Sequence, residues 1–385
     1  MSVQTVLGDV KAHDLGITLT HEHFNLRFGQ FFVKPPENLS KFLEGNITLK
    51  NVGYIRQYPY SNKSNLEFYG KDVDDAVLEE MYLFKKSGGG TILENTTHGL
   101  DPNLELMKKV MHNTGVNVIL GTGHYVAAVQ NSNTLKETTE QIYKTMLKDL
   151  TDGYDEDISV KAGFIGEVGS SWPMHDFEKR CIEAVGMLQS ALNCAVSFHP
   201  GRHSKCPWEI LRIFSEAGGN IKKANMSHLD RTITKEDQLL EFAQLGSYCQ
   251  FDLFGIETSL YQFNTNIVMP SDAERIKRIK TLINNGKANK ILMSHDIHTK
   301  HRLVNFGGHG YSHIINNIIP QMESKGIEKS VIDQITIQNP ASWLCSVKTR
   351  APGAAFHLDN DNYKLVHLSV LLINAILESV KEGII

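Results

Sequence analysis

The stretch ITLTHEH, residues 17–23, joins an apolar run to two histidines that are separated by one residue. In an extended strand, side chains two residues apart point to the same side of the sheet. The imidazoles of His21 and His23 can then bind one cation together, provided that the run is a strand whose end faces a site. The rest of the chain decides whether both conditions hold.

Apolar runs of the same kind, ending in polar or histidine-containing residues, recur along the chain. They are GGTILENTT (89–97), VNVILGTGHY (116–125), AGFIGEVG (162–169), CAVSFHPG (194–201), KANMSHLD (223–230), GSYCQFDLFG (246–255) and NKILMSHDIH (289–298). Helical patterns separate most of them, for example at 73–86, 135–150, 177–191 and 272–285. Nearly all-apolar strands indicate a parallel sheet buried on both faces. Eight strand-and-helix units favour a closed (β/α)₈ TIM barrel over an open sheet.

The barrel is expected to occupy residues 1–348. The stretch 29–70, rich in Pro, Asn and Tyr, is predicted to be a long loop over the barrel mouth. Residues 349–385 are interpreted as a linker followed by an apolar helix within 363–385. A membrane span needs about 20 apolar residues, and His367, Asn374 and Glu378 interrupt this one. A helix that covers the barrel or a partner surface is therefore preferred.

Composition narrows the class of protein. Of 385 residues, 41% are hydrophobic, and the net charge of −4 comes with no long basic run, which argues against nucleic-acid binding. Five cysteines without CxxC spacing argue against a disulfide framework and favour reduced thiols in the cytosol. Residues 1–16 lack the pattern of a secretory signal. The partner expected is a small-molecule substrate, and homo-oligomer formation is left open.

The polar residues at the strand ends carry the predicted chemistry, because the C-terminal ends of barrel strands share one mouth. Imidazoles and carboxylates without nearby thiols suit Zn²⁺ and similar divalent ions. Six ligands exceed one tetrahedral site, so two metal ions are expected, with a carboxylate from the middle strand bridging them. A modified lysine could also bridge two metal ions, and Lys161 precedes Glu167 on the same strand. Lys161 would lie about 20 Å back along this strand, at the opposite end of the barrel, so Glu167 is the bridging candidate. The predicted ligands are His21, His23, Glu167, His199, His228 and Asp296.

The ordered motifs from about Val3 to Trp343 resemble the animal branch of the phosphotriesterase family, within the amidohydrolase superfamily. They are TLTHEH, ENTT, GFIGEVGSSWP, HPGR, MSHLDRT, DLFG, HDIHTK and GGHGYSHI. The resemblance implies a binuclear metal hydrolase in which His21, His23 and Asp296 hold the more buried ion. It implies that His199 and His228 hold the more exposed ion. Glu167 matches the bridging position, where many relatives have a carboxylated lysine.

The resemblance also implies an activity, since the animal branch is associated with hydrolysis of N-acetyltaurine to taurine and acetate. Related N-acyl taurines or N-acyl amino acids are included in this expectation. The implied mechanism is attack by a metal-bridging hydroxide, with Asp296 passing the proton to the leaving amine. The alternatives are a lactonase or phosphotriesterase using the same metals, and a barrel that has lost catalysis. The last would be expected to lack ligands, whereas all six are present.

A sulfonate substrate requires positive or hydrogen-bonding groups near the mouth, and several lie just past the strand ends. Arg231 and Lys300 are the first choices, and His298 is alternatively a residue that orients a metal ligand. The alternative for most of them is a hydrogen bond within a loop. The predicted substrate contacts are Arg231, Lys300, Arg202, His298, Tyr125 and Tyr311, and Arg302 and His309 are further candidates.

Overall fold

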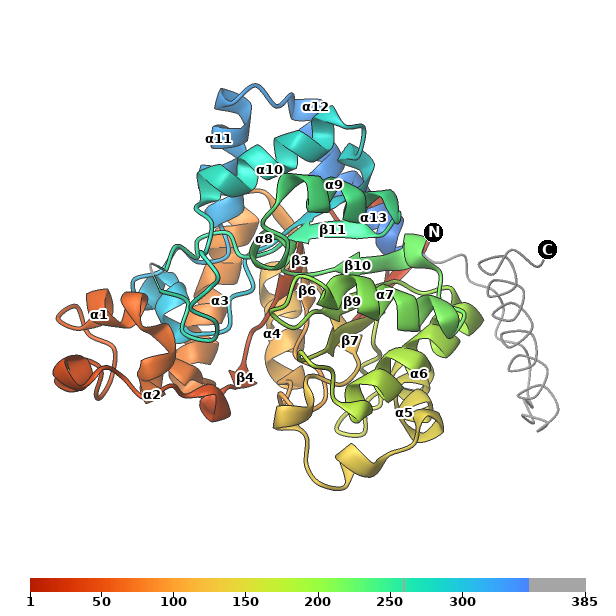
Figure 1. Cartoon of the computed structure of the whole chain (residues 1–385), viewed down its shortest axis with the longest axis horizontal. Coiled ribbons are helices and arrows are strands. Elements are labelled where there is room, and N and C mark those ends of the chain that lie inside the picture. Colours follow the sequence, from red (N-terminus) through yellow and green to blue (C-terminus); the bar gives the residue numbers. More distant parts are fainter. Residues whose placement is uncertain (259, 346–385) are drawn as a thin grey trace, which may run out of the picture. The chain divides into compact units, whose positions relative to one another are not determined.

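Eight parallel strands form one sheet that curls almost into a closed barrel in the computed structural model, which describes residues 1–258 and 260–345 (Figure 1). The order across the sheet is β12-β11-β10-β9-β8-β7-β6-β3, and each neighbouring pair is parallel. The strands are β3 (Ile17–Glu22), β6 (Gly89–Glu94), β7 (Asn117–Thr122), β8 (Phe164–Gly169), β9 (Val196–His199), β10 (Ala224–Met226), β11 (Tyr248–Phe251) and β12 (Ile291–Met293). Each predicted apolar run contains one of them, which confirms the predicted barrel.

The first and last strands meet without a regular ladder among the described residues. The backbone N–H of Asp296 donates to the carbonyl of His21 at 3.0 Å. The N–H of His21 donates to the hydroxyl of Ser294 at 2.9 Å. These bonds close the barrel where the two predicted ligands stand, so the closure itself sets His21 beside Asp296.

Helices surround the strands, as Figure 1 shows. The longer helices are α3 (Lys71–Lys86), α4 (Leu104–Thr114), α5 (Thr139–Thr151), α6 (Asp176–Leu192), α7 (Cys206–Glu216), α9 (Glu236–Gln244) and α10 (Asp272–Asn284). The shorter ones are α1 (Val52–Gln57), α2 (Lys63–Leu66), α8 (Leu229–Thr232), α11 (Ile319–Ser324), α12 (Lys329–Asp333) and α13 (Asn339–Leu344). The helix predicted at 135–150 corresponds to α5, but α5 begins later, at Thr139. Thr138 and Gln141 form a capping box that starts this helix.

Two small antiparallel pairs lie outside the barrel sheet: β1 (Ser2–Thr5) with β2 (Gly8–Lys11), and β4 (Leu26–Arg27) with β5 (Glu67–Phe68). Within the sheet, β7 and β8 approach so closely that a Cβ added to Gly121 would stand 1.7 Å from the carbonyl oxygen of Gly166. Only glycine fits there. This close approach places the following residue of β8, Glu167, at the rim.

The segment 29–70 is not a plain loop, since it contains α1 and α2. It does reach the barrel mouth, where the hydroxyl of Tyr60 lies 3.2 Å from Nε2 of His298. The predicted C-terminal helix at 363–385 and the predicted boundary near 348 lie outside the described residues. Within the described ranges, no helix has both the length and the apolar character that crossing a bilayer requires.

Candidate metal centre

The structure brings the six predicted ligands into one buried cluster at the C-terminal rim of the barrel. Each comes from the end of a strand or from the residues that follow it, and none is more than 7% exposed. They form two groups whose donor atoms lie within 4.8 Å of one another. The groups are His21, His23 and Asp296, and Glu167, His199 and His228.

Distances within the first group match a shared cation site. Oδ1 of Asp296 lies 3.2 Å from Nε2 of His23 and 3.8 Å from Nε2 of His21. Both imidazoles therefore present Nε2 to one carboxylate oxygen, as expected for two side chains on one face of β3.

Glu167 connects the first group with the second. Its Oε2 lies 2.8 Å from Nδ1 of His199 and 3.4 Å from Nε2 of His21. Its Oε1 lies 3.6 Å from Nε2 of His23. Nε2 of His228 completes the second group, 2.8 Å from Nδ1 of His199. The carboxylate of Glu167 thus touches both groups, which is the position that a bridging ligand occupies.

One orphaned atom tests whether these residues fit a metal. Nε2 of His21 is buried and has no hydrogen-bond partner among the described residues. Its other ring nitrogen, Nδ1, lies 2.9 Å from Oδ2 of Asp252 and donates to that carboxylate. In the neutral ring the lone pair of Nε2 faces Glu167 and Asp296; burial lowers the pKa of His21, but Glu167 and Asp252 outweigh burial and raise that pKa, as expected where negative charge lacks a cation. A buried acceptor in that state is costly unless a cation occupies the space, so the donor set fits divalent metal ions.

Electrostatics keep the carboxylates ionised. Burial alone raises the pKa of Glu167, but the nearby His21 and His199 outweigh burial and hold that pKa well below its usual range. Burial likewise raises the pKa of Asp296, and His298 and His23 hold it well below the ordinary value. Burial lowers the pKa of His199 to about 3, despite the opposing charge of Glu167. At neutral pH the cluster therefore offers charged oxygens and a neutral imidazole.

A supporting residue that the sequence analysis missed is Asp252, which follows β11. Its Oδ1 accepts a hydrogen bond from Nδ1 of His228 at 2.8 Å, and its Oδ2 accepts one from Nδ1 of His21 at 2.9 Å. Thr96 plays a similar part for His23, with Oγ1 3.0 Å from Nδ1. Partners of this kind fix the ring orientation of a ligating histidine. The only signal for Asp252 in the sequence is its position in the motif DLFG.

The backbone is unusual at two positions of the cluster. His228 has φ of 56° and Asp296 has φ of 55°, both in the left-handed region. Residues other than glycine rarely adopt this conformation, and it costs roughly 1–3 kcal/mol when the surroundings impose it. Both strained residues are predicted ligands, so the strain falls where side-chain direction matters most.

A small cavity of about 30 Å³ adjoins the cluster, and four of the predicted substrate-binding residues line it. They are Tyr125, Arg202, Arg231 and His298. Arg202 donates from Nε to the hydroxyl of Tyr261 at 2.7 Å. Arg231 donates to the carbonyl of Pro200 at 3.2 Å. Within residues 1–258 and 260–345, neither guanidinium forms an ion pair with a carboxylate.

Lys300 and Tyr311, the other two of the six predicted substrate contacts, do not line this cavity. Nζ of Lys300 pairs with Oδ2 of Asp72 in α3 at 2.7 Å, so its charge is already balanced elsewhere. The buried hydroxyl of Tyr311 donates to the carbonyl of His23 at 2.6 Å and supports the strand end from behind. Lys161 donates to the carbonyl of Thr151, away from the cluster, as expected.

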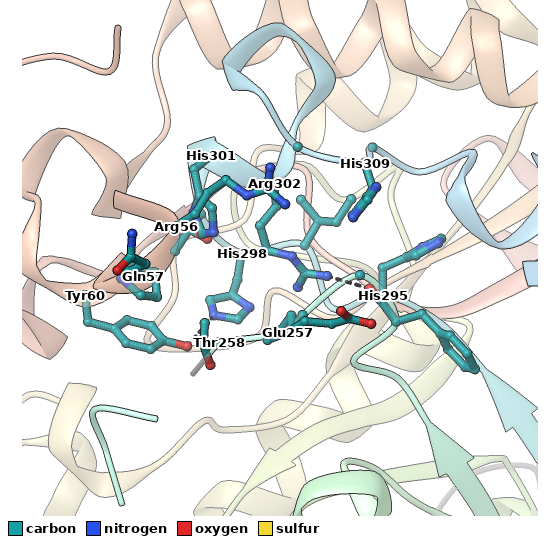
Figure 2. A pocket seen from close by; sticks show the side chains of 18 of the residues that line it. Arg56, Gln57, Tyr60, Glu257, Thr258, His295, His298, His301, Arg302 and His309 are labelled. Carbon is teal, nitrogen blue, oxygen red and sulfur yellow. Dashed lines mark hydrogen bonds between the residues drawn. The ribbon is translucent and has the colours of Figure 1, made fainter. Parts of the chain in front are cut away.

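A larger cavity of about 360 Å³ lies next to the small one, and Figure 2 shows its side chains. Tyr60 and His298 belong to the walls of both cavities. The other two predicted candidates, Arg302 and His309, line the larger cavity. Arg302 donates to the carbonyl of Asp296 at 2.6 Å, so it also holds the loop that carries this ligand.

Comparisons with known proteins identify the family and the fold of this chain. The sequence model of the Phosphotriesterase family matches residues 1–344. A phosphotriesterase-related protein from Drosophila ananassae is 49% identical over 344 residues, covering 89% of this chain and 98% of the relative. A resiniferatoxin-binding protein from Rhodobacter sphaeroides has a similar structure, with TM-score 0.84, 24% identity and coverage of 89% and 94%. A lactonase from Listeria monocytogenes shares the fold, with TM-score 0.71, 17% identity and coverage of 90% and 99%.

Proposed function

This chain belongs to the phosphotriesterase family and is a metal-dependent hydrolase, and from that premise we propose that its substrate is an N-acyl taurine. The preferred substrate is N-acetyltaurine, cleaved at its amide bond to taurine and acetate. Related N-acyl taurines and N-acyl amino acids belong to the same substrate class. The enzyme would work in the cytosol, which fits its five cysteines, all free thiols.

The proposed centre holds two divalent ions, with Zn²⁺ preferred. His21, His23 and Asp296 would hold one ion, His199 and His228 would hold the other, and Glu167 would be a ligand shared by the two. When bound, such a pair polarises a carbonyl oxygen and makes water a nucleophile at neutral pH. The chain's own side chains supply the remaining functions: binding the substrate, orienting it and moving the proton.

The observation that carries the substrate assignment is the pair of guanidiniums at the small cavity. Arg202 and Arg231 line it, and neither has a carboxylate partner among the described residues. An arginine side chain stays charged in proteins, and a buried charge without a counter-charge is unfavourable. An anionic group on the substrate would supply that counter-charge. The sulfonate of taurine is such a group, whereas a neutral lactone or phosphotriester is not.

Asp296 is proposed to handle the proton. Its Oδ1 lies 3.2 Å from Nε2 of His23 and 3.3 Å from Nδ1 of His298. Its pKa is held well below the ordinary value, so it is ionised at neutral pH, as a group that accepts a proton from the attacking water must be. It then donates that proton to the amide nitrogen, which leaves poorly until it is protonated.

The substrate needs more space than the small cavity offers. About 30 Å³ is the room of a single water molecule, whereas the adjoining cavity has about 360 Å³. The hydroxyl of Tyr60 points toward His298 (Figure 2), and both residues line both cavities. We propose that the bound substrate reaches from the cluster past these two side chains.

The test is a side-by-side measurement of kcat/KM with metal-reconstituted protein. The panel contains N-acetyltaurine, N-acetylethanolamine as its uncharged counterpart, a lactone and a phosphotriester. N-acetyltaurine should be hydrolysed fastest. Faster turnover of the lactone or the phosphotriester would contradict the proposal and support the alternative hydrolases.

Variants sharpen this test. Arg231→Gln should lower kcat/KM for N-acetyltaurine by roughly 10- to 150-fold, because a hydrogen bond to a charged group contributes about 1.5–3 kcal/mol. The same variant should leave N-acetylethanolamine nearly unchanged. Lys300→Gln is the matched control, since Lys300 pairs with Asp72 outside the cavity. Equal losses on both amides would indicate that Arg231 supports the fold and not the sulfonate.

A further inference from the structure

The larger cavity of about 360 Å³ has a positively charged wall, to which the proposed function assigns no ligand. Arg56 of α1 and Arg302, which follows β12, both line it, and neither lines the small cavity. Both arginines lie with His301 and His309 in the upper part of Figure 2, and Glu257 lies below them. Glu257 is the single carboxylate among the described residues of this wall.

Arg302 has a buried charge that no carboxylate balances. It is 7% exposed, and its guanidinium donates to the carbonyls of Asp296 at 2.6 Å and of Phe254 at 2.9 Å. Within residues 1–258 and 260–345, no carboxylate forms an ion pair with this guanidinium or with that of Arg56. A buried charge without a counter-charge is unfavourable. The cavity therefore favours an anionic ligand.

The other ionisable groups of the wall do not change the sign of its charge. Glu257 is bound elsewhere, since its Oε1 accepts the backbone N–H of Asp272 at 2.8 Å, at the positive end of α10. Burial lowers the pKa of His309 to about 4. Burial and the nearby Arg302 hold the pKa of His301 well below its ordinary value. Both rings are uncharged at neutral pH, so two guanidiniums face one carboxylate.

The cavity also offers a free hydroxyl and an apolar surface. Oγ1 of Thr258 is buried and has no hydrogen-bond partner among the described residues. A carboxylate oxygen would accept its proton and satisfy it. Phe254, Ile256 and Ile297 line the same cavity and can contact methylene groups. A carboxylate joined to a short alkyl chain fits both features.

The acyl part of the substrate is the part that can enter this cavity, an inference that rests on the proposed function. With the sulfonate at Arg202 and Arg231 and the scissile carbonyl at the metal cluster, the acyl chain extends away from the sulfonate. Tyr60 and His298 line both cavities, so a chain that passes them enters the larger one.

We propose that Arg56 and Arg302 bind a carboxylate at the far end of the acyl chain. Acyl groups longer than acetyl are then accepted best when they derive from a dicarboxylic acid, as glutaryl does. The reaction remains hydrolysis of the amide. For N-glutaryltaurine, the oxygen of water bonds to the acyl carbon and the C–N bond breaks. Both protons of the water end on the amine nitrogen at neutral pH, and the products are glutarate and taurine.

The first experiment compares kcat/KM for N-glutaryltaurine and N-pentanoyltaurine, whose chains have equal length but end in a carboxylate and a methyl group. Metal-reconstituted wild type should prefer the glutaryl substrate by at least about tenfold, because hydrogen bonds to charged groups are strong. Arg56→Gln should lower this ratio by roughly fivefold, since Arg56 is exposed and water screens its charge. Arg56→Lys should retain most of the preference. The ratio is insensitive to a general loss of activity.

Lys63→Gln is the matched control. Lys63 is an exposed cation of the neighbouring helix α2 and lines neither cavity. Its replacement removes one positive charge near the mouth and should leave the ratio unchanged. An equal fall of the ratio in Lys63→Gln and Arg56→Gln would show a general effect of charge and overturn the proposed contact.

Binding of free glutarate and pentanoate, measured by calorimetry on the metal-loaded enzyme, separates this inference from the proposed function. Glutarate should bind at least about tenfold more tightly than pentanoate, and Arg56→Gln should remove roughly fivefold of that preference. If this holds while neither N-acyl taurine is hydrolysed, the proposed function fails and the carboxylate site stands. Equal binding of the two acids would overturn the inference. A glutarate preference that Arg56→Gln leaves intact would place the second carboxylate on the metal ions and overturn it too.

Discussion

Replacing Asp252 by asparagine should weaken metal binding at both proposed rim sites, and it should weaken one site more than the other. Each oxygen of this carboxylate accepts two N–H groups. Oδ1 accepts from the backbone N–H of His228 at 2.9 Å and from its Nδ1 at 2.8 Å. Oδ2 accepts from Nδ1 of His21 at 2.9 Å and from the side-chain amide of Gln250 at 2.8 Å. An asparagine NH₂ group would face two donors in either orientation.

The orientation of that amide sets the size of the effect. The backbone N–H of His228 is fixed, whereas the Gln250 amide keeps a second acceptor, Oγ of Ser227 at 3.0 Å, so the NH₂ group should turn toward His21. Loss of a partner behind a ligating histidine typically costs 10–100-fold in metal affinity, equivalent to about 1.4–2.7 kcal/mol. The site that uses His21 should lose roughly 100-fold and the site that uses His228 about 10-fold or less.

Stepwise zinc dissociation constants, measured by chelator competition, provide the assay. Glu178→Gln is the control, because Glu178 is an equally buried carboxylate that accepts backbone N–H groups but forms no hydrogen bond with the six proposed ligands. Both constants of the Asp252→Asn variant staying within about threefold of wild type would refute the reasoning. A selective loss at the His228 site would refute the predicted amide orientation alone.

Three further changes test other features. Asp296→Asn should lower amide turnover by at least about 100-fold while circular dichroism stays native, because the proton carrier is lost; near-normal turnover would exclude that role. Burial raises the pKa of Glu80 to about 7 against two opposing backbone N–H bonds, so its stabilising contribution is complete below about 4.5 and disappears as pH rises through 7. Melting temperature should therefore fall less from pH 5 to pH 8 in Glu80→Gln than in wild type. Gly121→Ala should cost about 3 kcal/mol or more in chemical denaturation, because its Cβ would meet the carbonyl of Gly166 at 1.7 Å.

The barrel and the six clustered side chains were predictable for one physical reason. Parallel strands run in one direction, so the residues after each apolar run must meet at the same rim. Local patterns locate His199 and His228 at strand ends without any knowledge of their neighbours. The convergence then follows from the topology and not from long-range contacts.

Side-chain pairing across the fold could not be predicted in this way. Lys300 follows the last strand as a substrate contact would, yet its charge is balanced by Asp72, 228 residues earlier in the chain. Asp252 serves His21 and His228 only because β3, β10 and β11 place their ends around it. Tyr60 reaches the mouth from a segment with no regular pattern. These contacts depend on angles and distances that a linear order does not contain.

The bond from Asp296 to the His21 carbonyl has a consequence for how the enzyme matures in the cell. One proposed ligand pair is synthesised among the first residues, while the carboxylate that completes it emerges near the end of the described chain. A nascent polypeptide cannot assemble this triad until Asp296 has left the ribosome. Metal loading at this proposed site therefore has to wait until the last strand of the barrel has been synthesised.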